Sequence, residues 1–286
     1  MKVGIVGAEN SHAAAIAKLI NVEQRFKGVT VDIIWGETAE FAIKTAEAGS
    51  IPQIAKKPQD MLGRVDAVIV DHRHPKHHVK AAMPFVKEGI PCFVDKPFCY
   101  RAAEGKTLLK AAAKHGAPLT SFSAVPHQRS YRAFVRKLEG LGRVVAGTLH
   151  GACDLHSKYG GIFFYGIHQV DAALNAFGYN VSRVLVTKNG NGATGQLLYS
   201  DGKIVTLNLV REGCPGFSIG AVGAEGGIFK PLVFDKNTYL AGVRLIVKMF
   251  KTGEEPCSAE QMLKPVQVLE AMEKSVKSGS TERVMR

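Results

Sequence analysis

The sequence predicts an α/β protein of two domains, an N-terminal doubly wound parallel sheet and a C-terminal α+β domain with an open, mainly antiparallel sheet. The length of 286 residues suits two domains of ordinary size. Strand and helix patterns alternate through the first 120 residues, which is typical of parallel strands joined by crossover helices. Beyond that point successive strands are flanked by few helices. We therefore expect domains at 1–120 and 121–286.

In the N-terminal half, short apolar runs are followed by alanine-rich or amphipathic segments with capping residues at their ends. Ser11 is a candidate N-cap for the first helix, and Gly49 is a candidate terminator of the second. Continuous apolar strands suit a sheet that is covered on both faces. The expected strands are 2–6, 29–35, 66–70, 91–94 and 118–122, and the expected helices are 11–21, 38–48, 77–88 and 102–115.

The C-terminal half has longer strands in which apolar and polar residues partly alternate. The sequence Ser-Asp-Gly-Lys at 200–203 is a hairpin signal between two of them. A helix is expected at 168–177 and another at 259–277. The expected strands are 144–149, 181–187, 195–199, 203–210 and 219–222.

Composition narrows the class of protein. Hydrophobic residues make up 46% and charged residues 22%, which favours a globular chain over a disordered one. The net charge is +12, but the lysines and arginines are dispersed, so we expect no nucleic-acid partner. No apolar run reaches the ~18 residues that a membrane span needs. The five cysteines form no CxxC pair, and no secretory signal is evident, so we expect reduced thiols and a cytoplasmic protein.

The turn after the first strand is a degraded dinucleotide fingerprint. In the pattern G-x-G-x-x-G, Gly7 takes the first position, whereas Glu9 and His12 replace the second and third glycines. Backbone N–H groups at a helix start can still bind a phosphate, and Asn10 and Ser11 add side-chain donors. Glu9 would repel a pyrophosphate if it pointed inward. The turn is therefore either a cofactor site or an ordinary strand–helix connection.

Glu37 lies just beyond the second expected strand, where dinucleotide-binding proteins place a carboxylate that binds the ribose. A carboxylate at this position also suits the start of the following helix. The two interpretations are compatible. If Glu37 reaches the ribose, it disfavours a 2′-phosphate, which favours NAD over NADP.

Residues 71–78, Asp-His-Arg-His-Pro-Lys-His-His, follow the strand at 66–70. Four histidines in this run raise the question of a metal site, but their spacing matches no standard zinc pattern and basic residues interrupt them. We expect no metal here. The carboxyl end of a parallel strand is instead where such sheets bind ligands, which makes Asp71, His72 and His78 candidate cofactor contacts.

The strand at 91–94 ends in Asp95, Lys96 and a proline. A carboxylate can position a lysine, and the lysine can donate to a substrate oxygen. A solvated ion pair at a strand end is the alternative.

Residues 89–97, G-I-P-C-F-V-D-K-P, resemble the segment A-G-K-H-V-x-x-E-K-P of the Gfo/Idh/MocA oxidoreductase family. Residues 160–171, G-G-I-F-F-Y-G-I-H-Q-V-D, resemble that family's G-G-x-x-x-D-x-G-x-H-x-x-D. His78, 18 residues before Lys96, matches a family histidine that opens the preceding helix. The closing stretch 253–277 also resembles the family's tail, so the resemblance extends over nearly the whole chain.

The resemblance implies a Rossmann-type N-terminal domain and a C-terminal substrate-binding and oligomerisation domain. It assigns Lys96 and His168 as the catalytic lysine and histidine. Asp95 replaces the usual glutamate, which keeps the charge on a shorter side chain. Phe164 stands where many members have an aspartate that assists the acid–base chemistry, and Tyr165 is a candidate substitute or a packing residue.

The expected function is hydride transfer between NAD (NADP is possible) and a secondary alcohol or ketone of a sugar, sugar derivative or polyol. Two alternatives stay open: a non-catalytic or regulatory dinucleotide- or sugar-binding protein of the same fold, and an NAD-dependent glycosidase-like enzyme. The family implies a homodimer or homotetramer. The expected catalytic residues are Lys96, His168 and Tyr165; the expected cofactor contacts are Gly7, Asn10, Ser11, His12, Glu37, Asp71, His72, His78, Asp95 and Lys96.

Overall fold

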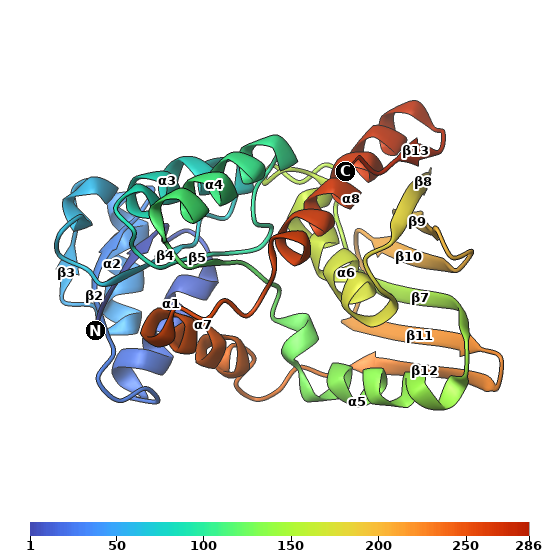
Figure 1. The fold of residues 1–286 in the computed structure, drawn as a ribbon, viewed down its shortest axis with the longest axis horizontal. Helices are drawn as coiled ribbons and strands as arrows, with labels where there is room; N and C mark the ends of the chain where they lie inside the picture. The colour runs from blue at the N-terminus through green and yellow to red at the C-terminus, as the bar shows by residue number, and fades with distance from the viewer. Residues whose placement is uncertain (286) are drawn as a thin grey trace. The chain divides into compact units, whose positions relative to one another are not determined.

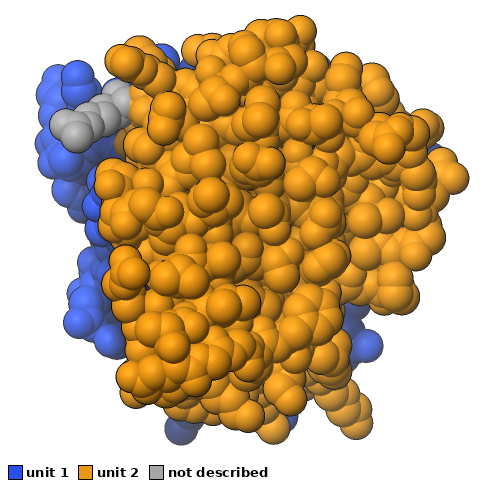
Figure 2. All heavy atoms as spheres, turned by 90° about the vertical axis from the view of Figure 1, so that its right-hand side faces the viewer, with its two compact units in different colours: residues 1–122, 239–262 blue, residues 123–238, 263–286 orange. Residues whose placement is uncertain are grey.

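The computed structural model describes residues 1–285, which form two compact units (Figures 1 and 2). The first unit comprises Met1–Phe122 and Tyr239–Met262, and the second comprises Ser123–Thr238 and Leu263–Arg286. The first unit therefore includes a segment from the C-terminal half of the sequence. The roles of the two units as cofactor and substrate domains stay predictions.

The first unit contains a six-stranded parallel sheet with the order β3-β2-β1-β4-β5-β6. This order confirms the predicted doubly wound sheet, and β4 is buried at every position, as expected for a strand covered on both faces. The strands are β1 (Lys2–Val6), β2 (Thr30–Trp35), β3 (Gln53–Ile54), β4 (Ala67–Val70), β5 (Cys92–Val94) and β6 (Leu119–Thr120).

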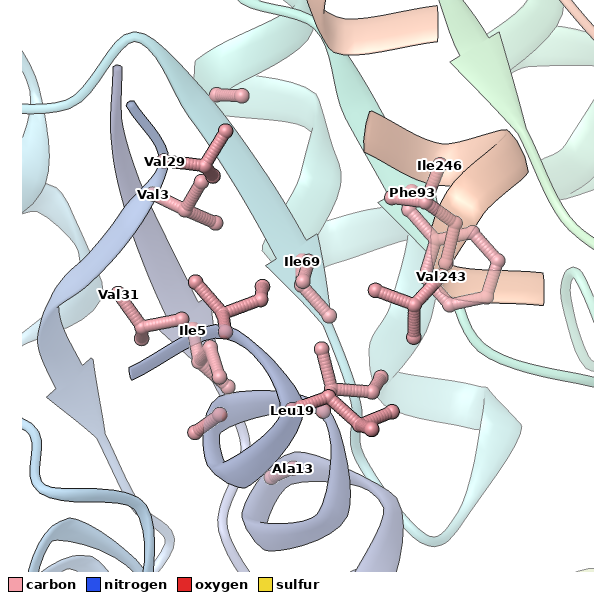
Figure 3. Packing of buried hydrophobic residues seen from close by; sticks show 14 of the residues in the cluster. Val3, Ile5, Ala13, Leu19, Val29, Val31, Ile69, Phe93, Val243 and Ile246 are labelled. Atoms are coloured by element: carbon pink, nitrogen blue, oxygen red, sulfur yellow. The ribbon is translucent and has the colours of Figure 1, made fainter. Parts of the chain in front are cut away.

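Helices of the first unit follow the predicted positions closely. The main difference is α7, an unpredicted helix that packs into the core of this unit through Val243 and Ile246 (Figure 3). The helices are α1 (Ser11–Ala17), continued by a π-helical turn at Lys18–Val22, α2 (Ala39–Gly49), α3 (His78–Lys87), α4 (Ala102–His115) and α7 (Leu240–Thr252), with short 3-10 turns at Pro58–Met61 and Pro75–His77.

The end of α2 differs from the expectation in one residue. Gly49 was expected to end the helix, but Ser50 takes the left-handed conformation, with φ 48°. Gly49 has a different function, because a Cβ there would lie 2.5 Å from the Cβ of Ala17. A small residue is needed where α2 crosses α1, and the adjacent serine makes the turn.

The second unit has a seven-stranded sheet in the order β12-β11-β7-β10-β9-β8-β13, in which only β7 and β10 pair in parallel among the described strands. The predicted open, mainly antiparallel sheet is confirmed. Its strands are β7 (Val144–Ala152), β8 (Val181–Asn189), β9 (Gly192–Tyr199), β10 (Ile204–Val210), β11 (Phe217–Gly223), β12 (Gly226–Leu232) and β13 (Glu282–Arg283).

The predicted hairpin joins β9 to β10, with the N–H of Tyr199 donating to the carbonyl oxygen of Lys203 over 3.0 Å. Among residues 1–285 no helix is both long enough and apolar enough to cross a lipid bilayer. The unit's helices are α5 (Arg129–Leu138), which the sequence did not predict, α6 (Ile162–Phe177) and most of α8 (Ala259–Ser278), with short 3-10 turns at Val125–His127 and Glu139–Leu141.

Candidate functional site

Five side chains gather in the first unit where β1, β4 and β5 end, and we call them the polar cluster: Asn10, His12, Asp71, Asp95 and Lys96. Asp71 directly follows β4 and Asp95 directly follows β5. The strand order reverses at β1 and β4, and parallel sheets bind ligands at the carboxyl ends beside such a reversal. All five residues were predicted as cofactor contacts, and the structure brings them together.

Asn10 holds the two carboxylates of this cluster. Its amide nitrogen donates to Asp71 Oδ1 over 2.9 Å and to Asp95 Oδ2 over 3.0 Å. Asn10, and not Ser11, is the N-cap residue of α1, although its side chain makes no capping bond. The expectation of a Ser11 cap is wrong by one residue. The side-chain amide of Asn10 donates to the two carboxylates, and its expected contact with a phosphate stays a prediction.

The two aspartates differ in how firmly they hold a proton. Burial, followed by the nearby charge of Asp95, raises the pKa of Asp71 well above its ordinary value. Burial also acts to raise the pKa of Asp95, but interactions with His12 and Lys96 outweigh it, and this pKa lies below its ordinary value. His12 Nδ1 lies 3.0 Å from Asp95 Oδ1, and Lys96 Nζ lies 3.7 Å from Asp95 Oδ2. Asp95 is therefore the charged partner of the lysine.

Within residues 1–285, one group of side chains has metal-ligand chemistry and spacing: His12, Asp71 and Asp95, whose ligand atoms lie within 4.8 Å of one another. The amide nitrogen of Asn10 lies against both carboxylates and cannot coordinate a cation. Lys96 adds a positive charge beside them. Asp71 Oδ1 and both Asp95 oxygens are thus already engaged, whereas Asp71 Oδ2 is buried without a hydrogen-bond partner in the described part of the chain.

Glu37 binds the backbone of the turn after β1, which carries the degraded dinucleotide fingerprint. Gly7 has φ +112°, and a Cβ on it would lie 2.7 Å from the backbone of Asp71, so this position needs glycine. Glu37 Oε2 accepts the N–H groups of Ala8 over 2.9 Å and Glu9 over 3.0 Å. Its other oxygen, Oε1, is buried and has no hydrogen-bond partner in the described part of the chain. A fixed carboxylate with one unsatisfied oxygen at the end of β2 fits the ribose hydroxyls of a dinucleotide.

The histidine-rich turn after β4 is a packed structure. His78 is fully buried, with Nδ1 2.8 Å from the carbonyl oxygen of Pro97 and Nε2 2.8 Å from that of His72. It therefore connects this turn to the loop after β5. Burial lowers the pKa of His72 to about 3 and that of His74 to about 4, so both rings are neutral at pH 7. His72 stacks at a tilt on Trp35, the last residue of β2, with ring centroids 5.9 Å apart.

His168 lies in the second unit, in the second turn of α6. We expected this helix to begin at His168, but α6 begins at Ile162. The expectation treated Gly166 as part of a turn, whereas only Gly160 and Gly161 have positive φ, 101° and 58°. Gly166 is inside the helix, where a Cβ would lie 3.1 Å from Ile162 Cγ1. The glycine therefore provides close packing and not a chain reversal.

The ring of His168 is flanked by aromatic side chains and held by a serine. The ring centroids of Tyr165 and Phe217 lie 5.7 and 5.8 Å away. Tyr165 is 40% exposed and contacts Phe164 edge-on. Ser123 Oγ lies 2.8 Å from His168 Nδ1.

Asp171 supports this arrangement from the next turn of α6. It is buried, its Oδ2 accepts the backbone N–H of Ser123 over 3.2 Å, and its Oδ1 accepts the side-chain N–H of Asn175 over 3.1 Å. Burial raises the pKa of Asp171 to about 7. Sequence reasoning did not name Ser123 or Asp171 as site residues. The H-x-x-D spacing was a usable signal for Asp171, since it places both side chains on one face of a helix.

A doubly wound sheet with polar side chains gathered at its switch point is the arrangement of dinucleotide-binding α/β proteins. Residues 1–122 match the model of the Gfo/Idh/MocA family, described as an oxidoreductase family with an NAD-binding Rossmann fold. This match supports, over residues 1–122, the family resemblance that the motifs predicted. No curated protein gave a significant match.

Solved structures extend the likeness in fold to the whole chain. One is a scyllo-inositol dehydrogenase from Lactobacillus casei with bound NAD(H) and scyllo-inositol, with TM-score 0.86 and 13% identity over 99% of both chains. Another is a myo-inositol dehydrogenase from Corynebacterium glutamicum, with TM-score 0.83 and 14% identity over 100% of this chain and 99% of that one. A third, an oxidoreductase from Agrobacterium radiobacter in complex with NAD+, L-tartaric acid and magnesium, has TM-score 0.81 and 16% identity over 99% and 98%.

Proposed function

We propose that the protein is an NAD-dependent dehydrogenase or reductase acting on a secondary alcohol or ketone of a sugar, sugar derivative or polyol. The main support is Glu37, which two backbone N–H groups hold at the end of β2. Its second oxygen is buried and has no hydrogen-bond partner among residues 1–285. A ribose hydroxyl would satisfy that oxygen. The same negative charge would repel a 2′-phosphate, so we propose NAD and not NADP as the preferred cofactor.

The chemistry in this proposal divides between the cofactor and two side chains. A bound nicotinamide supplies or accepts the hydride. Lys96 is buried beside Asp95, so its ammonium group is held in place to donate a hydrogen bond to a substrate oxygen on which charge develops. His168, in the second unit, can exchange a proton with a hydroxyl group, a task that suits an imidazole at neutral pH. Tyr165 is exposed near His168 and is a candidate substrate contact.

Inositols and tartaric acid appear with the similar structures above, and these compounds carry adjacent hydroxyl groups. They support a substrate panel of cyclic polyols, sugars and hydroxy acids. The decisive first test is calorimetry with NAD and with NADP separately. We expect NAD to bind more tightly, and an absence of heat and of any thermal shift with both cofactors at millimolar concentration would refute the proposal.

A matched pair of variants tests the role of Glu37. In Glu37→Gln we expect NAD affinity to fall about tenfold and the preference over NADP to shrink, since one charge-assisted hydrogen bond is lost. Glu40→Gln is the control, because Glu40 is an exposed glutamate in the first turn of the same helix. Unchanged cofactor preference in Glu37→Gln would remove Glu37 from the site.

We further propose that the protein forms a homo-oligomer through the second-unit sheet. On the face opposite α6, the side chains of Val222, Phe229 and Ile204 are 53%, 57% and 44% exposed. Pairing of β11, β12, β7 and β10 places them on the same face. Light scattering after gel filtration tests this, and Phe229→Lys should shift the protein towards the monomer. A monomeric wild-type protein at micromolar concentration would contradict it.

A further inference from the structure

The partner that holds His168 is a hydroxyl group, and its own hydrogen bonds restrict where the imidazole proton can be. Ser123 is buried, and its Oγ lies 2.8 Å from His168 Nδ1. The same Oγ accepts the backbone N–H of Val125 over 3.2 Å. Within residues 1–285 the serine hydroxyl has these two hydrogen-bond partners.

The direction of the bond to His168 follows from this arrangement. An amide N–H can only donate, so Ser123 Oγ is the acceptor towards Val125. The hydroxyl still has one proton to place, and a buried donor without an acceptor is costly. Of its two partners only Nδ1 of His168 can accept that proton. Nδ1 is then an acceptor, and the single proton of a neutral imidazole is on Nε2.

The backbone around the serine is fixed from the other side. Asp171 Oδ2 accepts the N–H of Ser123, so the hydroxyl is attached to a held segment of chain. Phe164 lies four residues before the histidine and offers the ring no carboxylate. A carboxylate beside Nδ1 would retain a proton on that nitrogen, since a carboxylate only accepts. A serine hydroxyl that already accepts a backbone N–H instead donates its proton to Nδ1, which leaves that nitrogen unprotonated.

We propose that Ser123 is a positioning residue that keeps neutral His168 as the tautomer protonated at Nε2. In this state the ring offers a donor from Nε2 to a substrate oxygen. It can take a proton at Nε2 only after its own proton has moved to Nδ1 and the serine hydroxyl has turned to accept. The catalytic meaning of this tautomer rests on the proposed function, whereas the tautomer itself does not.

The tautomer can be measured without substrate or cofactor, by NMR of the intact protein labelled with 15N-histidine at about pH 8.5, where an ordinary imidazole is neutral. The His168 signals are assigned by their loss in His168→Gln. We expect Nδ1 to resonate as the unprotonated nitrogen and Nε2 as the protonated one. A proton on Nδ1 in the wild-type protein would overturn the proposal, whatever the variants show.

Three serine variants separate positioning from a structural effect. Ser123→Ala should move the His168 ring signals towards a mixture of tautomers, and Ser123→Thr, which keeps the hydroxyl, should restore the wild-type pattern. Ser130→Ala is the control: it removes an exposed serine bond, from Oγ to the carbonyl oxygen of Val233, and should leave the His168 signals unchanged. Unchanged His168 signals in a folded Ser123→Ala protein would refute the role of the hydroxyl.

Measurement of turnover tests the catalytic role of Ser123, which rests on the proposed function. With an identified alcohol substrate, Ser123→Ala should raise kcat for its oxidation, because the ring can then take a proton at Nε2 without first moving its own. KM for the cofactor should change little, and Ser123→Thr should return kcat to the wild-type value. If the NMR result is as expected but kcat is unchanged, the tautomer is established and its catalytic role is refuted. If no cofactor binds at all, the proposed function fails while the NMR result still decides the tautomer.

Discussion

Asp171 makes the stability of this protein depend on pH in an unusual direction. It is buried, and burial raises its pKa to about 7. An unfolded aspartate has a pKa of about 3.9, so between these values the native state holds a proton that the unfolded chain has lost. Stability from this group is therefore present at low pH and is lost progressively as pH rises from about 3.9 to about 7. Most carboxylates that gain a partner on folding have the opposite dependence.

The size of the effect follows from the distance between the two pKa values. From pH 5 to pH 8 the unfolded aspartate stays ionised, while the native one passes from protonated to ionised. At about 1.4 kcal/mol per pH unit over the two units below pH 7, the contribution falls by about 3 kcal/mol. Asp171→Asn removes the titration, because the amide stays neutral. The difference in unfolding free energy between wild type and variant should therefore move by about 3 kcal/mol against the wild type across this range.

Urea unfolding at pH 5, 6, 7 and 8, followed by circular dichroism, measures this difference. Asp201→Asn is the matched control, since Asp201 is an exposed aspartate whose pKa is lowered to about 2, first by the hydrogen bond from Lys203. The difference in unfolding free energy between Asp201→Asn and the wild type should not change from pH 5 to pH 8. The reasoning would be refuted if the difference in unfolding free energy between wild type and Asp171→Asn did not change with pH, or if it changed in favour of the wild type.

Three further predictions concern the polar cluster, the fingerprint turn and the proposed chemistry. Asn10→Ala should lower the free energy of unfolding by about 3 kcal/mol, since two hydrogen bonds to buried carboxylates are lost, and urea unfolding measures this. Asn180→Ala is the control and should have little effect, because its side-chain bonds to Ser200 and Asp201 are exposed. Gly7→Ala should cost about 3 kcal/mol or more, because its φ is +112° and the backbone after β4 blocks a Cβ, and thermal unfolding measures the loss. Lys96→Ala and His168→Ala should each reduce turnover at least ~100-fold, and calorimetry should show intact cofactor binding in His168→Ala. Wild-type turnover in either variant would remove that residue from the mechanism.

Sequence patterns predicted the first unit well because its signals are local. The strand at Lys2–Val6 and the helix at Ala102–His115 lie where the apolar runs and capping residues placed them. Local patterns did not predict α7, which the structure places in the first unit, or the start of α6 at Ile162. In α6 the glycine of the Tyr-Gly-Ile run suggested a turn, and only its packing against the preceding helical turn shows why it belongs inside a helix.

The residues of the site were partly predictable, but their bonds were not. Asn10, Asp71 and Asp95 were each expected near a cofactor because they follow strand ends, yet their hydrogen bonds join positions 61 and 85 residues apart. Ser123 and His168 are 45 residues apart, and no local motif marks the serine. Spacing can indicate which residues face one edge of a sheet. It cannot show which donor each carboxylate obtains, since that depends on packing between elements distant in the chain.

The inclusion of α7 in the first unit has a consequence for how the chain is made on the ribosome. Burial of the five apolar side chains of α7 stabilises the first unit by about 10 kcal/mol, which is comparable with the net stability of a whole domain. The N-terminal 122 residues emerge more than a hundred residues before α7 does. At a synthesis rate of ~5–20 residues per second, about 6–24 s pass between synthesis of the sheet and synthesis of the helix that completes its core. During that interval it exposes the apolar surface around Phe93 that α7 later covers, so a truncated chain ending at residue 122 should be a chaperone substrate and not a stable domain.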